Sequence, residues 1–132
     1  FRDYAAAHPH VRCYEALGAQ NYYAAMAQAR YMIGNSSSGM WESSSFRLPV
    51  VNIGPRQQGR VHGDNVVNCE LEPAAIAAAI AKATDPAFRA GLDGRNPYVQ
   101  ADTVARILGS LKHPWDRQRL LAKRFVDPLG LR

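Results

Sequence analysis

The chain has 132 residues, 47% of them hydrophobic and 20% charged, a length and composition that correspond to one globular domain and exclude a disordered, collagenous or coiled-coil protein. No apolar run reaches about 18 residues, so the sequence predicts neither a transmembrane helix nor a membrane partner. The net charge of +5 lies entirely in residues 106–132, which hold seven Lys or Arg and two Asp or Glu, and no binding motif accompanies that charge, so no nucleic-acid partner is expected.

The start of the chain has neither an initiator Met nor the pattern of a signal peptide. We therefore expect a piece of a longer protein. Two cysteines, Cys13 and Cys69, do not make a disulfide framework, and both lie in strand-like stretches where buried free thiols are expected. Free thiols favour a reducing compartment, so we expect a cytoplasmic location.

Short β-branched or aromatic runs alternate with longer Ala-rich stretches along the chain. The runs predict strands over residues 11–15, 31–34, 50–53 and 65–69. The intervening patterns predict helices over residues 2–7, 20–30, 39–46, 73–83, 86–91 and 98–112, and a short basic helix over 115–125. This alternation is typical of an α/β fold with a parallel sheet and helices on both faces, in which ligands bind at the carboxyl ends of the strands.

The first candidate binding loop runs from Gly34 to Glu42 and follows the predicted strand 31–34. At the start of a helix the backbone N–H groups are unpaired and the dipole is positive, so serine hydroxyls added there favour a phosphate. The alternative is a helix capped by Asn35 or a serine. Glu42 lies one helical turn further on, where a carboxylate can accept the two hydroxyls of a ribose.

The second candidate loop runs from Gly54 to Arg60 and follows the predicted strand 50–53. Arg56 and Arg60 lie in it, and a planar guanidinium binds phosphate with two parallel hydrogen bonds. A solvated turn with surface arginines is the alternative for this loop alone. A hydroxyl-rich loop and an arginine-rich loop at two neighbouring strand ends together indicate a phosphorylated ligand.

These two loops resemble the hydrolysing branch of the UDP-N-acetylglucosamine 2-epimerase family. The motifs of that branch are G-N-S-S-x-G-x-x-E and P-x-x-N-x-G-x-R-Q-x-G-R, and residues 34–42 and 49–60 carry every named position. The non-hydrolysing branch carries D-S-G-G-x-x-E-E and T-E-R-P-E instead, and neither occurs here. The resemblance covers most of residues 11–112, although Asn96-Pro97-Tyr98 is not followed by the usual Gly-Asp-Gly.

The resemblance implies the C-terminal, Rossmann-like half of a GT-B fold, in which a UDP-sugar binds in the cleft between two domains. It places Ser36 and Ser37 at the diphosphate, Glu42 at the ribose hydroxyls and Arg56 at the nucleotide. Tyr22 stands where the family has an aromatic residue near the uracil, with a core tyrosine as the alternative. The resemblance implies no cofactor and no metal.

The same resemblance implies that no catalytic residue lies in this chain. In the family, the carboxylates that move the C2 proton belong to the N-terminal domain, and a histidine belongs to a Gly-x-x-His-Arg segment that precedes the C-terminal domain. Residues 1–132 contain neither. The whole enzyme would convert UDP-N-acetylglucosamine and water into N-acetylmannosamine and UDP, for sialic acid or capsule biosynthesis, and we expect the fragment alone to be inactive.

We therefore expect a UDP-binding domain over residues 1–113 and a basic tail helix over residues 114–132. The expected partners are UDP or UDP-N-acetylglucosamine and the missing N-terminal domain, against which the tail would pack unless it packs on its own domain. A homodimer is left open. Two alternatives remain: the nucleotide-binding domain of another GT-B enzyme (a glycosyltransferase or an epimerase for another UDP-sugar), and a non-catalytic nucleotide-binding module.

Overall fold

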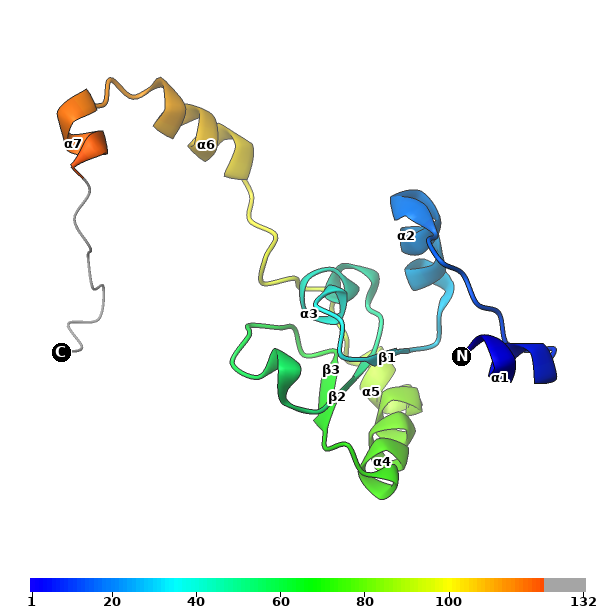
Figure 1. The fold of residues 1–132 in the computed structure, drawn as a ribbon. Coiled ribbons are helices and arrows are strands. Elements are labelled where there is room, and N and C mark those ends of the chain that lie inside the picture. The colour runs from blue at the N-terminus through cyan, green and yellow to red at the C-terminus, as the bar shows by residue number, and fades with distance from the viewer. Residues whose placement is uncertain (123–132) are drawn as a thin grey trace. The chain divides into compact units, whose positions relative to one another are not determined.

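The computed structural model describes residues 1–122, which belong to two units, Phe1–Val99 and Gln100–Arg132. Figure 1 shows the elements in chain order. The α-helices and the two short 3₁₀ helices (η1, η2) are α1 (Arg2–Ala7), α2 (Gly18–Gln28), α3 (Ser38–Trp41), η1 (Ser43–Phe46), η2 (Pro55–Gln57), α4 (Pro73–Thr84), α5 (Pro86–Ala90), α6 (Thr103–Lys112) and α7 (Arg117–Leu121).

Three parallel strands form the sheet, in the order β1-β2-β3. Met32 is paired with Val50, and Val50 with Val66, so the three strands end at the same edge. The predicted α/β fold with a parallel sheet is confirmed, as are three of the four predicted strands. Their bounds are β1 (Met32–Gly34), β2 (Val50–Ile53) and β3 (Val66–Cys69).

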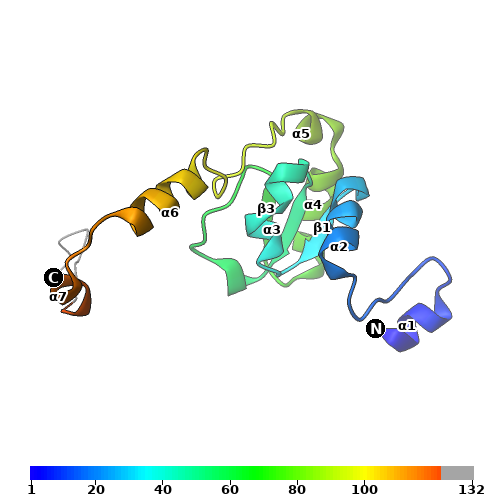
Figure 2. The same ribbon diagram turned by 90° about the horizontal axis from the view of Figure 1, so that it is seen from above.

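Helices cover both faces of this sheet, as predicted. Successive residues of a strand point to opposite faces. Val51 of β2 belongs to a buried cluster with Ala79 and Ala83 of α4, and α4 runs alongside the strands in both ribbon views (Figures 1 and 2). Val50 lies against Gly39 of α3, so α3 covers the opposite face.

The close contact between α3 and β2 depends on a residue without a side chain. A Cβ atom at position 39 would lie 2.9 Å from Cγ1 of Val50, closer than carbon atoms pack. The next residue, Met40, is fully buried. The backbone of α3 therefore packs directly on the sheet. This contact fixes the distance of Glu42, at the end of α3, from the sheet.

One predicted helix, over residues 39–46, is wrong in its extent. It divides at Glu42 into α3, which has four residues, and η1. The hydroxyl of Ser43 donates to the carbonyl of Gly39 at 2.6 Å, and Arg47 ends η1 with a left-handed φ of 50°. Serine hydroxyls compete with helical hydrogen bonds by binding nearby backbone groups, so a run of three serines disfavours a longer helix.

A buried polar network ties η1 to the start of β3. Nδ2 of Asn65 donates to Oγ of Ser43 at 2.7 Å and to the carbonyl of Leu48 at 2.6 Å. The hydroxyl of Ser44 donates to Oδ1 of Asn65 at 2.8 Å. A side chain at Gly63 would overlap this network. Every polar atom of the Asn65 side chain is thus paired, as burial requires.

The predicted strand over residues 11–15 is not present. This segment has no strand partner, and four of its five residues are exposed, including Cys13. A strand is stabilised by ladder hydrogen bonds and by burial of at least one face, and this segment has neither. The expected burial of both thiols is therefore wrong for Cys13, while Cys69 is half-buried; both are free.

Two predicted helices begin elsewhere. α2 begins at Gly18, two residues before the predicted start, and Met26 is its one buried residue. Tyr22 is half-buried and Tyr23 is exposed. The buried face of this helix is therefore narrower than predicted. α6 begins five residues after its predicted start, because turns precede it and Asp102 has a left-handed φ of 67°.

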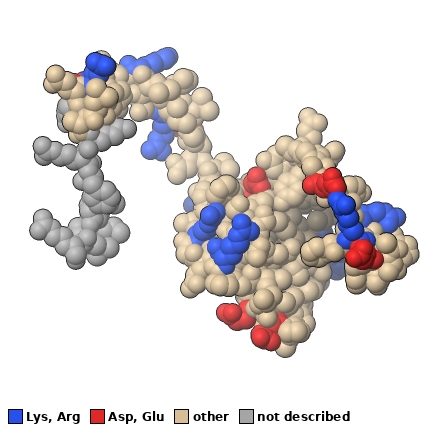
Figure 3. Space-filling model, in the orientation of Figure 1, with Lys and Arg blue, Asp and Glu red and all other residues tan. Residues whose placement is uncertain are grey.

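The second unit contains α6 and α7, and none of its described side chains is buried. Basic side chains lie along both helices (Figure 3). Of the helix predicted over residues 115–125, the described part contains α7, over Arg117–Leu121; residues 123–132 lie outside the described part of the chain. Over residues 1–122, no helix combines the length and apolarity needed to cross a membrane. The apolar residues of α6 are exposed on one side: Val104, Ile107, Leu108 and Leu111.

Replacing Gly39 with alanine tests the contact between α3 and β2. The added methyl group overpacks the sheet face, so we expect Gly39→Ala to lower the free energy of unfolding by about 1–3 kcal/mol, measured by urea denaturation. Gly109→Ala is the matched control, because position 109 is helical with nothing within 4 Å of a Cβ, and it should cause no loss. A Gly39→Ala variant as stable as the parent would contradict the contact.

Candidate functional site

The serine loop follows β1 and leads into α3. Ser36 is exposed, and its hydroxyl accepts a hydrogen bond from the N–H of Ser38 at 3.3 Å. Ser37 is the residue before α3, but its side chain does not cap that helix. The alternative of a serine cap is observed at Ser36, whose hydroxyl accepts from the first N–H group of α3, whereas the described contacts of Asn35 are with Arg56 and Gln57. Since α3 has four residues rather than the predicted eight, its dipole contributes less to an anion site than the sequence suggested.

The carboxylate of Glu42 accepts hydrogen bonds from two hydroxyl groups. The hydroxyl of Ser38, one turn earlier on α3, donates to Oε2, and the hydroxyl of Tyr23 donates to Oε1 at 3.3 Å. Tyr22 donates in turn to Oγ of Ser38 at 2.8 Å. The predicted site residues Tyr22 and Glu42 are thus connected through Ser38. The carboxylate is held in one orientation by partners on two helices, α2 and α3.

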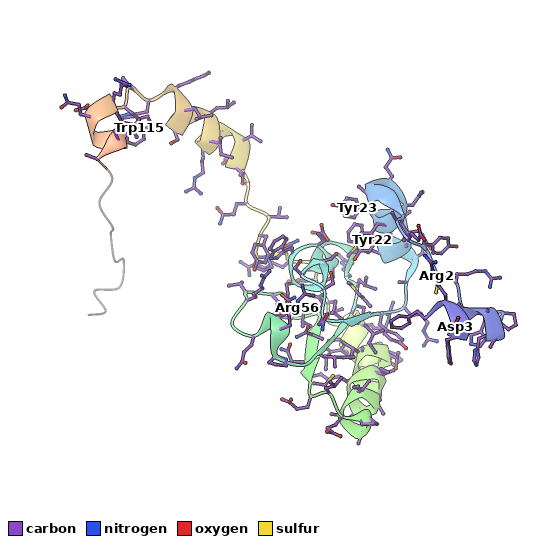
Figure 4. All side chains as sticks on the ribbon, in the orientation of Figure 1. Arg2, Asp3, Tyr22, Tyr23, Arg56 and Trp115 are labelled. Carbon is purple, nitrogen blue, oxygen red and sulfur yellow. The ribbon has the colours of Figure 1, made fainter. Side chains whose placement is uncertain are left out.

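Sequence reasoning assigned no site role to Ser38 or Tyr23. Ser38 lies four residues before Glu42, a spacing that places two side chains on the same face of a helix, and this signal was available. Tyr23 is the neighbour of Tyr22 on α2 (Figure 4), and nothing in its sequence position distinguishes it. The contact of Tyr23 with Glu42 depends on how α2 packs on η1, which the sequence pattern does not specify.

The negative charge of Glu42 acts on the phenol of Tyr23. It raises the pKa of Tyr23 above its ordinary value, because the phenolate would lie beside a carboxylate. The hydrogen bond from Tyr23 to Glu42 adds to this effect, since it exists only while the phenol is protonated. The phenol of Tyr23 therefore stays protonated, and able to donate, to a higher pH than an ordinary tyrosine.

A pocket of about 560 Å³ opens beside this carboxylate. Glu42, Tyr22 and Tyr23 form one wall, and the segment from Tyr14 to Ala19 forms the other. The pocket is therefore lined by two carboxylates, those of Glu15 and Glu42, by three tyrosine rings and by the backbone near Gly18. Such a lining can stack against a flat ring and accept hydrogen bonds from hydroxyl groups.

The second loop reaches the first at Asn35. Nη1 of Arg56 lies 3.3 Å from the carbonyl oxygen of Asn35 and 3.4 Å from its Oδ1, and Nε2 of Gln57 donates to the same carbonyl at 2.7 Å. Arg56 is exposed and keeps most of its five N–H donors free. The hydroxyl-rich and arginine-rich loops are thus neighbours, as predicted. They meet because β1 and β2 are adjacent parallel strands.

The predicted site residues fall into two groups on these elements. Tyr22 and Glu42 line the pocket of about 560 Å³, whereas Ser36, Ser37 and Arg56 do not. The second group lies on the turns after β1 and β2 instead. Figure 4 shows Tyr22 on α2 and Arg56 on the turn after β2.

The Asn96-Pro97-Tyr98 segment holds the site's surroundings together. Nδ2 of Asn96 donates to the carbonyl of Trp41 at 2.7 Å and to the hydroxyl of Ser45 at 2.8 Å. The hydroxyl of Tyr98 donates to the carbonyl of Val61 at 2.7 Å. These hydrogen bonds connect the Asn96-Pro97-Tyr98 segment with the end of α3 and with the segment after η2. The motif therefore stabilises the fold here.

No group of three or more metal-ligating His, Cys, Asp or Glu side chains occurs in residues 1–122. The four histidines do not lie in the pocket beside Glu42. The chemistry available at this site is therefore that of hydroxyls, the carboxylates of Glu15 and Glu42, a guanidinium and aromatic rings.

The sequence also matches a known protein family. A model of the family described as UDP-N-acetylglucosamine 2-epimerase matches residues 1–112. Since this match covers most of the chain, the chain belongs to that family. The match includes both candidate loops and α2.

Three named proteins are similar to parts of this chain. The chain is 45% identical over 60 residues to the hydrolysing GDP/UDP-N,N'-diacetylbacillosamine 2-epimerase of Campylobacter jejuni, over 46% of this chain and 16% of that protein. It is 33% identical over 94 residues to polysialic acid biosynthesis protein P7 of Escherichia coli, over 70% of this chain and 24% of that protein. It is 26% identical over 102 residues to the UDP-N-acetylglucosamine 2-epimerase of Neisseria meningitidis, over 77% of this chain and 27% of that protein. The chain thus aligns with at most 27% of these relatives.

Removing the charge of Glu42 tests its contact with Tyr23. In a Glu42→Gln variant the carboxylate no longer opposes the phenolate, so we expect the pKa of Tyr23 to fall, as measured by NMR titration of the tyrosine ring resonances. Glu15→Gln is the matched control, since Glu15 lines the same pocket without a hydrogen bond to Tyr23. An unchanged Tyr23 titration in Glu42→Gln would show that the contact does not form in solution.

Proposed function

We propose that this chain is the C-terminal, UDP-binding domain of a hydrolysing UDP-N-acetylglucosamine 2-epimerase. The observation that carries the proposal is the carboxylate of Glu42, held by Ser38 and Tyr23 at the wall of a ring-sized pocket. The two candidate anion-binding loops follow β1 and β2 at the same edge of the sheet. Membership of the family supplies the ligand class.

Each predicted residue takes one part of UDP in this proposal. The ribose hydroxyls donate to Glu42, whose two oxygens accept hydrogen bonds, and the uracil stacks near Tyr22. Ser36 and Ser37 donate to the diphosphate, and Arg56 neutralises it with its free N–H groups. A ribose hydroxyl that reaches Oε1 replaces the 3.3 Å hydrogen bond from Tyr23, which is long and therefore weak.

The proposed reaction of the whole enzyme needs groups that these residues do not provide. A base removes the C2 proton of the sugar while the C1–O bond breaks and UDP leaves. Water then adds across the resulting C1=C2 double bond, with its hydroxyl at C1 and a proton returned to the opposite face of C2 by an acid. Ser36, Ser37 and Arg56 stabilise only the leaving diphosphate. We therefore propose that the chain binds UDP but does not turn over the UDP-sugar by itself.

The proposed setting is an enzyme of the cytoplasm that acts in sialic acid or capsule synthesis. Its N-terminal domain supplies the acid and base, and the basic tail, in which Trp115, Leu120 and Leu121 are exposed, provides a surface on which that domain packs. The name of the Escherichia coli relative, a polysialic acid biosynthesis protein, supports the pathway.

A second candidate substrate is a UDP-N,N'-diacetylbacillosamine. It is favoured by the relative named for that activity, whose identity of 45% exceeds the 26% of the relative named for UDP-N-acetylglucosamine. The two sugars differ in substituents that the nucleotide groups do not contact. Product analysis of the full-length enzyme with both UDP-sugars separates the two candidates.

Isothermal titration calorimetry with UDP tests the ribose assignment. Loss of the charged acceptor in Glu42→Ala should weaken UDP binding by about tenfold, because a hydrogen bond to a charged group contributes about 1.5–3 kcal/mol. Glu15→Ala is the control, because Glu15 lines the same pocket but pairs with Arg2. Equal UDP affinity for the parent and Glu42→Ala would refute the assignment.

Incubation of the purified 132-residue chain with UDP-N-acetylglucosamine tests the predicted inactivity. We expect no N-acetylmannosamine, because the groups that move the C2 proton are not in this chain. Chromatography of the reducing sugars provides the measurement, and a full-length family member provides the positive control. Release of N-acetylmannosamine by the chain alone would place the catalytic residues within it.

A further inference from the structure

Gln57 is a buried side chain that joins the two candidate anion-binding loops. It belongs to η2, in the arginine-rich loop after β2, and is only 4% exposed. Its Nε2 donates to the backbone carbonyl of Asn35, in the serine-rich loop after β1, at 2.7 Å. A carbonyl only accepts hydrogen bonds, so the group of Gln57 that contacts it must be the NH₂ group. The two loops are therefore connected through the interior of the protein.

Each of these loops leaves its strand through a glycine. Gly34 is the last residue of β1 and has a φ of 143°, and Gly54 follows β2 and has a φ of 74°. Other residues rarely adopt such a φ. A Cβ atom at either position would meet nothing within 4 Å, so the backbone conformation, rather than a lack of space, requires glycine there. These turns, at the ends of adjacent parallel strands, bring Asn35 within reach of Gln57.

The carbonyl of Asn35 accepts from two donors that differ in length and exposure. The buried amide of Gln57 lies at 2.7 Å, whereas Nη1 of Arg56 lies at 3.3 Å and belongs to an exposed residue. A carbonyl oxygen has two lone pairs and can accept both, but the longer hydrogen bond is the weaker one. Arg56 can therefore leave Asn35 and pair with an anion while Gln57 keeps Asn35 in place.

Stability alone does not account for an amide at position 57. The Oε1 atom of Gln57 is buried and has no hydrogen-bond partner within residues 1–122, and an unpaired buried acceptor is unfavourable. A methionine would fill a similar volume without an unpaired atom. A buried polar group of this kind needs a reason other than packing. The hydrogen bond to Asn35 is the contact that an apolar side chain could not make.

We propose that Gln57 is a positioning residue for the diphosphate. It holds the carbonyl of Asn35, and through the backbone it holds Ser36 and Ser37 beside Arg56. This role rests on the proposed binding of UDP. Gln57 is enclosed by the protein and acts through Asn35 rather than on the ligand. Ordering both loops before binding lowers the entropic cost of bringing hydroxyls and a guanidinium together around one anion.

Calorimetry of the 132-residue chain with UDP and with uridine tests this role, because uridine lacks the diphosphate. Gln57→Met keeps the length of the side chain but removes the donor to Asn35. We expect its affinity for UDP to fall about tenfold and its affinity for uridine to equal that of the parent, since Glu42 and Tyr22 are unchanged. Gln58→Met is the matched control, because the neighbouring Gln58 is exposed, and it should alter neither affinity.

The outcomes separate a failure of this role from a failure of the proposed function. A Gln57→Met variant that binds UDP as the parent does would refute the positioning role alone. Equal losses for UDP and uridine would show that Gln57 only stabilises the fold. A parent that binds UDP no better than uridine would remove the diphosphate assignment, and the role of Gln57 with it.

A shorter amide provides a second test if Gln57→Met does not fold. The side chain of Gln57→Asn keeps the amide but is one methylene group too short to reach the carbonyl of Asn35. It should therefore show the same selective loss of UDP affinity, with uridine affinity retained. Parent-like affinity for UDP in Gln57→Asn would overturn the proposal.

Discussion

The buried hydrogen bonds of Asn65 are the constraint on which the site depends. The Asn65 side chain binds Ser43, Ser44 and the carbonyl of Leu48, and so joins η1 to the first residue before β3. Each partner is buried, so loss of one would leave polar atoms unpaired at about 1–3 kcal/mol each. Because η1 is fixed in this way, α3 must lie flat on β2, and Gly39 permits the contact. Glu42 lies between α3 and η1, so both contacts determine its position.

The hydroxyls around Glu42 give the carboxylate its second constraint. Ser38 on α3 and Tyr23 on α2 hold opposite oxygens, so the carboxylate orientation depends on both helices. Prior orientation lowers the entropic cost of ligand binding. The long contact from Tyr23 can be exchanged for a ligand hydroxyl, whereas the shorter contact from Ser38 can be kept. The site is thus ordered before a ligand arrives.

Sequence patterns predicted the sheet and the meeting of its loops well, for a physical reason. Runs such as Val50–Ile53 are short, β-branched and buried, and a parallel arrangement necessarily brings the residues after them to one edge. Arg56 and Asn35 therefore meet as expected. The pattern of residues 11–15 is equally strand-like, but a strand also needs a partner and a buried face, which a local pattern does not reveal.

Side-chain competition within α3 and η1 was harder to predict. Helical spacing suggested one helix over residues 39–46, and the hydroxyl of Ser43 ends it early by binding the carbonyl of Gly39. Ser38 stands at a position that varies in the family motif and yet provides the link between Tyr22 and Glu42. Its role depends on the approach of α2, a tertiary contact. The roles of Ser36 and Ser37 at a diphosphate remain predictions.

The most direct measurement compares UDP with 2′,3′-dideoxyuridine diphosphate, by calorimetry on the parent chain and on Glu42→Ala. If Glu42 accepts the ribose hydroxyls, the parent should bind UDP about tenfold more tightly than the dideoxy nucleotide, and the variant should bind both alike. Equal affinity of the parent for the two nucleotides, or undiminished discrimination in Glu42→Ala, would contradict the account.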